Sequence, residues 1–490
     1  MDEIAFLHDR AVVRFTVNVR AGVARTIPVP VSPVPSGRLA LAAAASAGHL
    51  ILMPTAAGSG VSHVHDTLGA ARARLARRDA EVLRAQVAVS EIPAPTGDEA
   101  KRGAWIARRF HALGLTGVHM DAAGNVIGRR AGATELSDEA PVVVCAHLDT
   151  VFPRGTPLRV RREGSLFTGP GIGDNGRGLA VMLELALELA DRSVAPMRCI
   201  DFVATTGEEG AGDLRGAKHY FAESVGGKGG RGGRAPVAVI ALDGAGDERV
   251  IHRALGARRF RIAYGGSGGH SWAAYGIPNA VHAAAIAGAR IAALALPAEP
   301  RTTLSVGRIG GGISVNAIPA EGWLEVDLRS TSGAVLERFD AELRALARAA
   351  GDDENSRRAT GTPPLSVTVD VIGDRPCGET DARHPLVLAA MQATRLIGRE
   401  PELTSASTDA NVPISLGIPA IALGAGGRGG EAHTTGEWFD NTDGTLGIAR
   451  ALTVVAAAAG VQAAGAPAAS LPRHDAVIPV SPPSFTLSRE

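Results

Sequence analysis

An imidazole and a carboxylate stand two residues apart at the end of an apolar run. Residues 142–146 read Val-Val-Val-Cys-Ala, and His147 and Asp149 follow directly. An unbroken apolar run is typical of a strand buried on both faces, and side chains at i and i+2 of an extended chain point the same way. Open α/β sheets bind ligands at the carboxyl ends of their strands. Taken alone, this stretch also fits a strand end capped by polar residues.

The pattern recurs along the chain, and the recurrence favours a chemical role over simple capping. Three further apolar runs, at 199–205, 237–242 and 420–423, predict buried strands that lead into polar residues. The polar residues that follow these runs, or that lie in a Gly-rich loop before a helix predicted at 179–189, are Asp174, Glu208, Glu209, Asp243 and His433. If all these segments meet at one sheet edge, two imidazoles and several carboxylates converge there.

Such a cluster predicts a metal site. Carboxylates that gather without a cation repel one another, and their pKa values rise. A set of His, Asp and Glu ligands with no cysteine suits zinc or a similar divalent ion. The carboxylates outnumber the places in one tetrahedral site, which favours two metal ions that share a bridging carboxylate.

A nucleotide site is the competing interpretation of the Gly-rich loop. Residues 171–176 match G-x-G-x-x-G and open a helix, as a dinucleotide-binding loop does. However, Asp174 would place a carboxylate in the loop that should hold a pyrophosphate. This interpretation also leaves the other acidic residues at strand ends unexplained, so we favour the metal.

Composition limits the class of protein and its partners. A chain of 490 residues is long for one domain and suits two. Lys and Arg number 50, as do Asp and Glu, so we expect no nucleic-acid partner and no association with a membrane. The three cysteines do not form a disulfide framework, because Cys145 and Cys199 lie in predicted core strands. A reducing, cytoplasmic location is therefore expected.

The order of predicted elements indicates an α/β fold with an insert. We expect a central, mostly parallel sheet flanked by helices, formed by 64–254 and 371–463. Between these segments, alternating strands and two helices follow the order β-α-β-β-α-β, which predicts an inserted ferredoxin-like α+β domain over 255–370. Residues 1–63 are expected to be a poorly ordered N-terminal extension, with Met53 as an alternative start. Residues 464–490 are Ala/Pro-rich and are expected to be a loose tail.

These motifs resemble those of a known family. The chain is similar to the zinc-dependent metallopeptidase family of peptidase T, carboxypeptidase G2, aminoacylase-1 and succinyl-diaminopimelate desuccinylase. Residues 147–151 resemble its H-x-D strand end, 173–178 its bridging-aspartate loop and 206–209 its paired glutamates. Asp243 and Ala432-His433 match its last two ligand positions. The resemblance spans roughly 65–463 and implies a zinc-exopeptidase-like catalytic domain with an inserted lid or dimerisation domain.

The resemblance also implies a role for each residue of the cluster. Asp174 would bridge two metals, Asp149 would hold the His147 ring, and Glu208 would be the general base. The remaining ligands would be His147 and Asp243 on one metal, and Glu209 and His433 on the other. Independently of the family, consecutive residues at a strand end are expected to diverge, so that only one glutamate of the pair binds metal.

Three residues of the insert complete the predicted site. His270, in Gly268-Gly269-His270-Ser271, resembles a lid histidine that stabilises the tetrahedral oxyanion, in several dimeric members from the partner subunit. Asn316 and Arg329 lie in segments that resemble those holding polar groups of the substrate. The alternatives are an exposed His270 without function and an Arg329 in an ordinary structural salt bridge.

Together these features predict a two-metal exopeptidase or amidohydrolase. Zinc is the expected metal, with cobalt or manganese as alternatives, and the substrate would be a small peptide or an N-acyl amino acid. The resemblance further implies a homodimer formed through the insert. Two alternatives remain: an N-acyl-amino-acid deacylase that shares every residue named, and a catalytically silent binding protein of the same fold.

Overall fold

The computed structural model describes residues 12–15, 27–30, 57–132, 140–191, 194–226 and 235–461. The chain divides into two compact units, Met1–Met53 and Pro54–Glu490. In the first unit, strands β1 (Val12–Phe15) and β2 (Ile27–Pro30) form an antiparallel pair. The tail predicted at 464–490 lies outside the described residues. All further description concerns the second unit.

The catalytic domain is organised around a nine-stranded sheet whose centre is parallel. Strands β8, β5, β9 and β19 lie side by side in one direction, and antiparallel strands flank them. The predicted α/β class with a mostly parallel centre is therefore confirmed. The strand order is β17 (Gly378–Glu379), β10 (Arg249–Ala254), β19 (Ala420–Leu423), β9 (Ala238–Leu242), β5 (Val142–His147), β8 (Ile200–Thr205), β4 (Val126–Arg130) and β3 (Thr116–Met120), with β18 (Glu402–Ala406) pairing β10.

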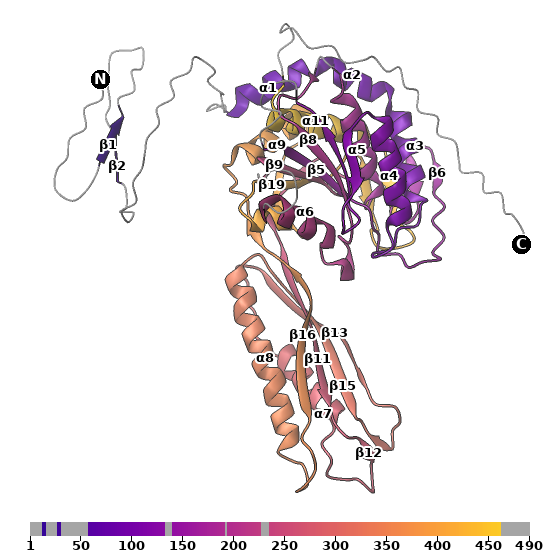
Figure 1. Cartoon of the computed structure of the whole chain (residues 1–490), viewed down its shortest axis with the longest axis vertical. Helices are drawn as coiled ribbons and strands as arrows, with labels where there is room; N and C mark the ends of the chain where they lie inside the picture. The colour runs from indigo at the N-terminus through magenta and orange to yellow at the C-terminus, as the bar shows by residue number, and fades with distance from the viewer. Residues whose placement is uncertain are drawn as a thin grey trace, which may run out of the picture. The chain divides into compact units, whose positions relative to one another are not determined.

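Helices cover both faces of this sheet, which explains the unbroken apolar run in β5. Val142 and Val144 pack into the core on one face, whereas Val143 and Cys145 pack into the core on the other. The first face is covered by α1 (Ala57–Thr67), α2 (Gly69–Arg77), α3 (Asp79–Ser90), α4 (Ala100–Ala112), α5 (Gly176–Glu188), α9 (Pro385–Leu396) and α11 (Gly444–Ala459), and the second by α6 (Arg215–Gly226) and α10 (Asn411–Ser415) (Figure 1).

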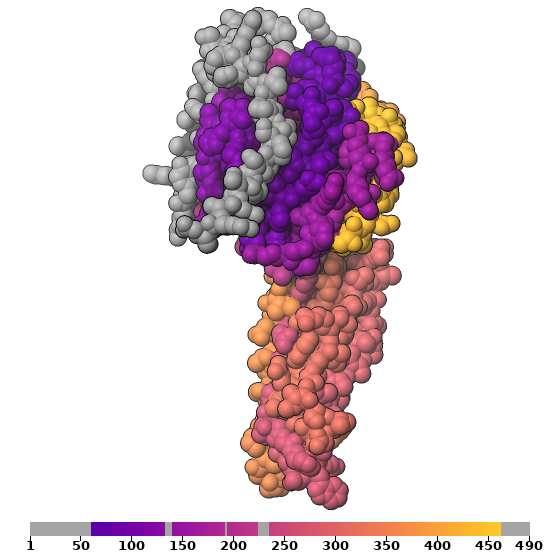
Figure 2. Space-filling view, turned by 90° about the vertical axis from the view of Figure 1, so that its right-hand side faces the viewer, coloured from indigo at the N-terminus to yellow at the C-terminus, as the bar shows by residue number. Residues whose placement is uncertain are grey.

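Segments from opposite ends of the described chain meet in this domain. Figure 2 shows indigo residues of the first helices beside yellow residues of the last one. His65 on α1 is buried, and its Nδ1 lies 3.2 Å from Thr453 Oγ1 on α11. The predicted boundary at residue 63 falls inside α1, where Val61 is also buried, so this helix belongs to the core rather than to an extension.

The insert has the predicted order of strands and helices. Its antiparallel sheet runs β13 (Thr302–Gly311), β15 (Glu321–Ser330), β11 (Gly256–Gly265) and β16 (Ser366–Arg375). Helices α7 (Ala280–Ala292) and α8 (Gly333–Asn355) share one core with this sheet (Figure 1). Strand β16 continues to Arg375, beyond the boundary expected at 370. A short pair, β12 (Gly269–His270) with β14 (Ala317–Ile318), extends from the insert.

Two smaller features differ from the expectation or add to it. Helices α2 and α3 are separated at Arg78, whose side chain forms an ion pair of 2.7 Å with Glu184 on α5. A small sheet, β20 (Arg428–Gly430), β21 (Trp438–Asp440), β7 (Leu166–Thr168) and β6 (Arg161–Glu163), has no counterpart in the predicted elements. Among the described helices, none is both long enough and apolar enough to cross a membrane.

Candidate metal centre

His147 ends strand β5 at the carboxyl edge of the sheet. Its ring is buried, with 2% of the side chain exposed. Nδ1 lies 3.0 Å from the main-chain oxygen of Asp149, and Nε2 lies 2.9 Å from Asp174 Oδ1. A carbonyl partner on one ring nitrogen fixes the orientation of the imidazole and leaves the other nitrogen to face the carboxylates.

Asp149 is fully buried, and it contacts the His147 ring, as predicted, together with groups that were not predicted. Its carboxylate lies 3.6 Å from His147 Nδ1, so the carbonyl oxygen, not the carboxylate, is within hydrogen-bond distance of the ring. The carboxylate instead accepts hydrogen bonds of 2.9 Å each from the main-chain N–H groups of Glu208 and Glu209 and from Thr96 Oγ1. Asp149 therefore ties the end of β5 to the segment that follows β8.

Asp174 lies between two imidazoles. Its Oδ1 is 2.9 Å from His147 Nε2, and its Oδ2 is 3.3 Å from His433 Nε2. The loop that carries it is held by the buried Glu437, whose carboxylate accepts hydrogen bonds from the N–H groups of Gly171 (2.7 Å), Gly173 (2.8 Å) and Asp174 (2.7 Å). Glu437 was not predicted, although it follows His433 by only four residues.

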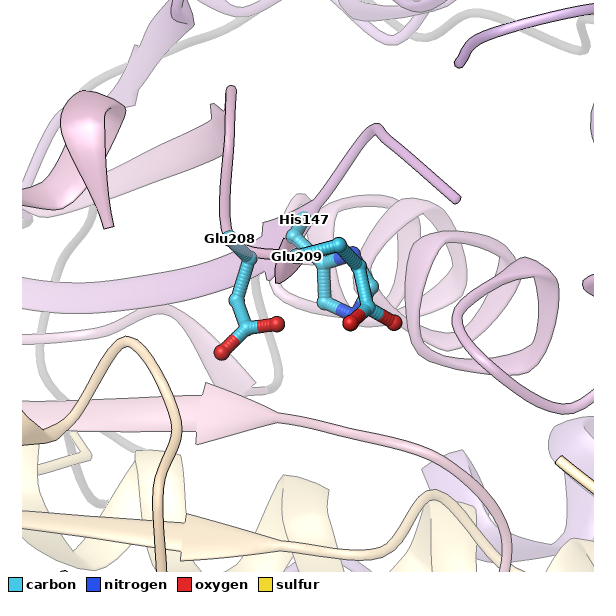
Figure 3. A group of neighbouring side chains, drawn as sticks. All are labelled: His147, Glu208 and Glu209. Carbon is cyan, nitrogen blue, oxygen red and sulfur yellow. The ribbon is translucent and has the colours of Figure 1, made fainter. Parts of the chain in front are cut away.

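Glu208 and Glu209 lie side by side, contrary to the expected divergence. Strand β8 ends at Thr205, and Gly207 adopts a φ of 62°, so the pair lies beyond a turn after the strand and does not continue it. Figure 3 shows both carboxylates directed to the same side of the segment, near His147. Their partners nevertheless differ: Glu209 Oε1 lies 2.9 Å from His433 Nε2, whereas Glu208 Oε1 accepts a hydrogen bond of 3.0 Å from Arg375.

The cluster contains three groups whose ligand atoms lie within 4.8 Å of one another. Two of these groups share Asp174, and they contain the two ligand sets expected from the sequence. The groups are His147 with Asp174 and Asp243, Asp174 with Glu209 and His433, and His147 with Glu208 and Glu209. The strand ends thus bring together all seven residues of the cluster predicted within the catalytic domain.

The protonation behaviour of the cluster reflects crowding of acids. Burial, together with the charge of Asp174, raises the pKa of Asp243 to about 7, and burial also raises the pKa of Glu208 and of Glu209. Hydrogen bonding to Asp174 raises the pKa of His433 to about 9. Burial opposes ionisation of Asp174, but hydrogen bonds from both histidines lower its pKa. Neighbouring carboxylates that resist ionisation are those that a bound cation would stabilise.

The donor set fits divalent metals. Imidazole Nε2 atoms and carboxylate oxygens suit zinc and related ions. Asp174 directs one carboxylate oxygen at His147 and the other at His433. This is the arrangement that a ligand bridging two ions needs. The three cysteines are free and take no part in these groups.

Arg375, at the end of β16, reaches this centre from the insert. Its side chain is only 7% exposed and forms an ion pair of 3.0 Å with Glu208 Oε1. It also donates a hydrogen bond to the main-chain oxygen of Glu208. Sequence analysis missed this contact because 167 residues separate the partners and nothing in the strand pattern marks Arg375.

The three residues predicted in the insert lie outside the metal-capable groups found among the described residues. His270 is exposed, and its Nδ1 accepts hydrogen bonds from the N–H groups of Trp272 (3.2 Å) and Ala273 (3.4 Å). Asn316 is exposed and contacts Ser314. Arg329 forms an ion pair of 2.7 Å with Asp327, as in the structural alternative.

An open cavity of about 700 Å³ adjoins the centre. Asp174, Asp243 and Glu437 line it, together with Gly427 and the residues of β20. Its mixed lining also includes Arg399 and Glu402. The cavity therefore gives a small molecule access to the carboxylates of Asp174 and Asp243.

Comparison with known proteins agrees with this architecture. Residues 125–272 match the family described as Peptidase family M28, and residues 254–355 match the Peptidase dimerisation domain. The second match falls on the insert. The two matches overlap over residues 254–272, at the start of the insert.

Relatives that cover more than half of the chain carry peptidase names. A probable carboxypeptidase of Aspergillus terreus is 25% identical over 311 residues, which cover 58% of this chain and 69% of that protein. Carboxypeptidase G2 of a Pseudomonas species is 27% identical over 358 residues, or 69% of this chain and 80% of that protein. The fold resembles that of aminopeptidase PepT from Bacillus cereus, with a TM-score of 0.61 and 23% identity over 77% of this chain and 98% of that one.

These findings confirm the family and the hydrolase class predicted from the sequence motifs. The peptidase and dimerisation families match in tandem, and the sequence relatives carry carboxypeptidase names. The chain is therefore similar to peptidases over its catalytic part and to a peptidase dimerisation domain over its insert, and these likenesses support a hydrolase of the metallopeptidase type.

Proposed function

We propose that this enzyme hydrolyses a peptide or N-acyl amide bond of a small substrate with two divalent metal ions, zinc being the expected metal. The observation that carries the proposal is the position of Asp174, whose two carboxylate oxygens lie 2.9 Å from His147 and 3.3 Å from His433. His147 and Asp243 would hold one ion and Glu209 and His433 the other, with Asp174 between them. When bound, such ions polarise a carbonyl group and lower the pKa of water.

The protein's own groups would carry out the proton transfers. Glu208 would accept a proton from the attacking water and return it to the leaving amine. Its carboxylate is buried near His147 and Glu209, and burial raises its pKa, which suits a group that must take up a proton. Asp149 would maintain the geometry by holding the N–H groups of Glu208 and Glu209.

The insert would complete the site. His270 would donate a hydrogen bond to the tetrahedral oxyanion through Nε2, since its Nδ1 already accepts main-chain hydrogen bonds. The match of the insert to a dimerisation domain supports a homodimer in which His270 serves the partner's site. Asn316 and Arg329 would hold a carboxylate or carbonyl of the substrate.

Metal analysis and a substrate panel test the proposal together. We expect about two metal ions per chain in the purified enzyme, and loss of hydrolysis on chelation with recovery on adding zinc, cobalt or manganese. Protein that binds no metal and hydrolyses nothing would instead be a binding protein of this fold.

The panel should vary both ends of the substrate. The sequence relatives are named carboxypeptidases and the structural neighbour is an aminopeptidase, so di- and tripeptides should be offered with free and with blocked termini. N-acyl amino acids belong in the same panel. Cleavage of these alone would identify the deacylase alternative, which uses the same residues.

A further inference from the structure

The base of the insert is bonded to the segment that carries the paired glutamates. Arg259, near the start of β11, donates a hydrogen bond of 2.5 Å to the main-chain oxygen of Gly210. The N–H of Asp374, near the end of β16, lies 3.0 Å from both carboxylate oxygens of Asp213. Arg375 follows with its contacts to Glu208. The two strands that connect the insert to the catalytic domain therefore both contact residues 208–213.

Arg375 fixes Glu208 in a way that Glu209 does not share. Its guanidinium binds the carboxylate of Glu208 at 3.0 Å and also the main-chain oxygen of the same residue. A further hydrogen bond of 3.1 Å joins it to Ser407, which lines the cavity beside the centre. Because Asp149 accepts the N–H of Glu208 at 2.9 Å, this residue is held at its amide, its carbonyl and its side chain.

We propose that Arg375 is a positioning residue that holds Glu208 in place for proton transfer and links it to the insert. The proposal rests on the proposed function, in which Glu208 is the general base. A glutamate side chain has three rotatable bonds, and a buried carboxylate without a partner is costly. A planar guanidinium with several donors can bind side chain and main chain at once, which the single ammonium of lysine does less well.

Arg375 could also bind substrate or only join the two domains, and each of these roles predicts a different effect of replacing it. An arginine that bound a substrate carboxylate would affect KM, and it would matter only for substrates with that carboxylate. An arginine that only joined the two domains would affect the melting temperature and leave kcat unchanged. A positioning role lowers kcat, leaves KM and metal content unchanged, and depends on the presence of Glu208.

The first test is Arg375→Lys, with Arg258→Lys as the matched control. Arg258 lies on β11, opposite Asp374 of β16, and is therefore close to Arg375 in the sheet. Its ion pairs with Glu337, Asp340 and Asp374 all stay within the insert. We expect Arg375→Lys to lower kcat by ~10–100-fold, as is usual when a group that orients a catalytic residue is lost. KM, metal content and melting temperature should match those of the control, whose kcat should equal that of the wild type.

The second test places the same change in a Glu208→Gln background. If Arg375 acts through Glu208, Arg375→Lys should cause no further loss of kcat there, because coupled residues are not additive. An equal loss in both backgrounds, a change confined to KM, or a lower melting temperature with unchanged kcat would each overturn the proposal. If Arg375→Lys fails to fold, Arg375→Gln takes its place, and failure of both to fold assigns Arg375 to domain stability instead.

Metal content and hydrolysis of the wild-type protein show whether a negative result contradicts the proposed function or only the role of Arg375. A wild-type protein without metal or hydrolysis contradicts the function itself. A wild-type enzyme with both, whose kcat survives Arg375→Lys, contradicts only the role of Arg375.

Discussion

The edge of the central sheet and the tip of the insert carry the two halves of the proposed chemistry, and they are built in opposite ways. At the sheet edge, the side chains of His147, Glu208 and Glu209 are 2%, 6% and 8% exposed. At the tip, near His270, Trp272 is 87% exposed and Val315 fully so. Side-chain contacts between distant segments hold the first region, whereas main-chain pairing of β12 with β14 holds the second and the side chains of His270 and Asn316 bond only to near neighbours in sequence.

This contrast indicates that the sheet edge is already organised before substrate arrives. The tip of the insert, in contrast, needs a second surface to cover it. Buried and fully bonded groups lose little freedom when the reaction begins, which favours catalysis. Exposed apolar side chains beside a predicted catalytic histidine are typical of a surface that becomes covered. Substitutions at the sheet edge should therefore act through fixed geometry, and substitutions at the tip should affect turnover without affecting stability.

The largest effect is expected from Glu208→Gln, which tests the sheet edge directly. The change keeps size and shape but removes the proton acceptor, so kcat should fall by ~10²–10⁴-fold. Metal content should stay normal, as measured by elemental analysis of the purified variant. Glu209→Gln is the matched control, and there metal occupancy should fall. If metal is lost only from the Glu208 variant, Glu208 would be the metal ligand and Glu209 the general base.

His270→Ala tests the tip. Loss of one oxyanion donor should lower kcat by ~10²–10³-fold, with metal content and melting temperature unchanged because the side chain is exposed. If the histidine acts across a dimer, mixing inactive His270→Ala and Glu208→Ala chains should restore part of the activity. Normal turnover in the single variant would leave the tip without a catalytic role.

Glu437→Gln tests whether a residue without a predicted role supports the centre. The amide would face N–H groups that now point at a carboxylate, so the loop of Asp174 should lose at least one of its three hydrogen bonds. We expect metal affinity to fall by ~10–100-fold in titrations of the metal-free protein. Glu402→Gln, another residue of the cavity lining, is the control and should keep wild-type affinity.

Arg329→Lys should have the smallest effect and tests the predicted substrate contact in the insert. If Arg329 binds a substrate carboxylate, the variant should raise KM ~10-fold for free-carboxylate substrates and much less for their amides. Its ion pair with Asp327 at 2.7 Å offers the structural alternative. Equal changes for both substrate types, with a lower melting temperature, would favour that alternative.

Much of the candidate metal centre could be predicted because each part has a local signal. Apolar runs identified the strands, and polar residues directly after them identified the edge where the ligands meet. The order of elements likewise identified the insert. Contacts between distant segments gave no such signal, as for Arg375 with Glu208 and Glu437 with the loop of Asp174. The relative placement of Glu208 and Glu209 differed from the expectation, which treated the pair as the end of a strand, whereas β8 ends at Thr205 and the pair lies beyond it.

The order of strands in the central sheet has a consequence for synthesis on the ribosome. Strand β19 pairs with β9 on one side and β10 on the other, yet it follows the whole insert in the chain. At usual translation rates, the segment from Ala254 to Ala420 takes on the order of ten seconds to emerge. Throughout that interval β9 presents an unpaired edge of apolar residues, the kind of edge that invites aggregation. The nascent chain should therefore depend on chaperones most strongly after the insert has folded and before Leu423 has left the ribosome.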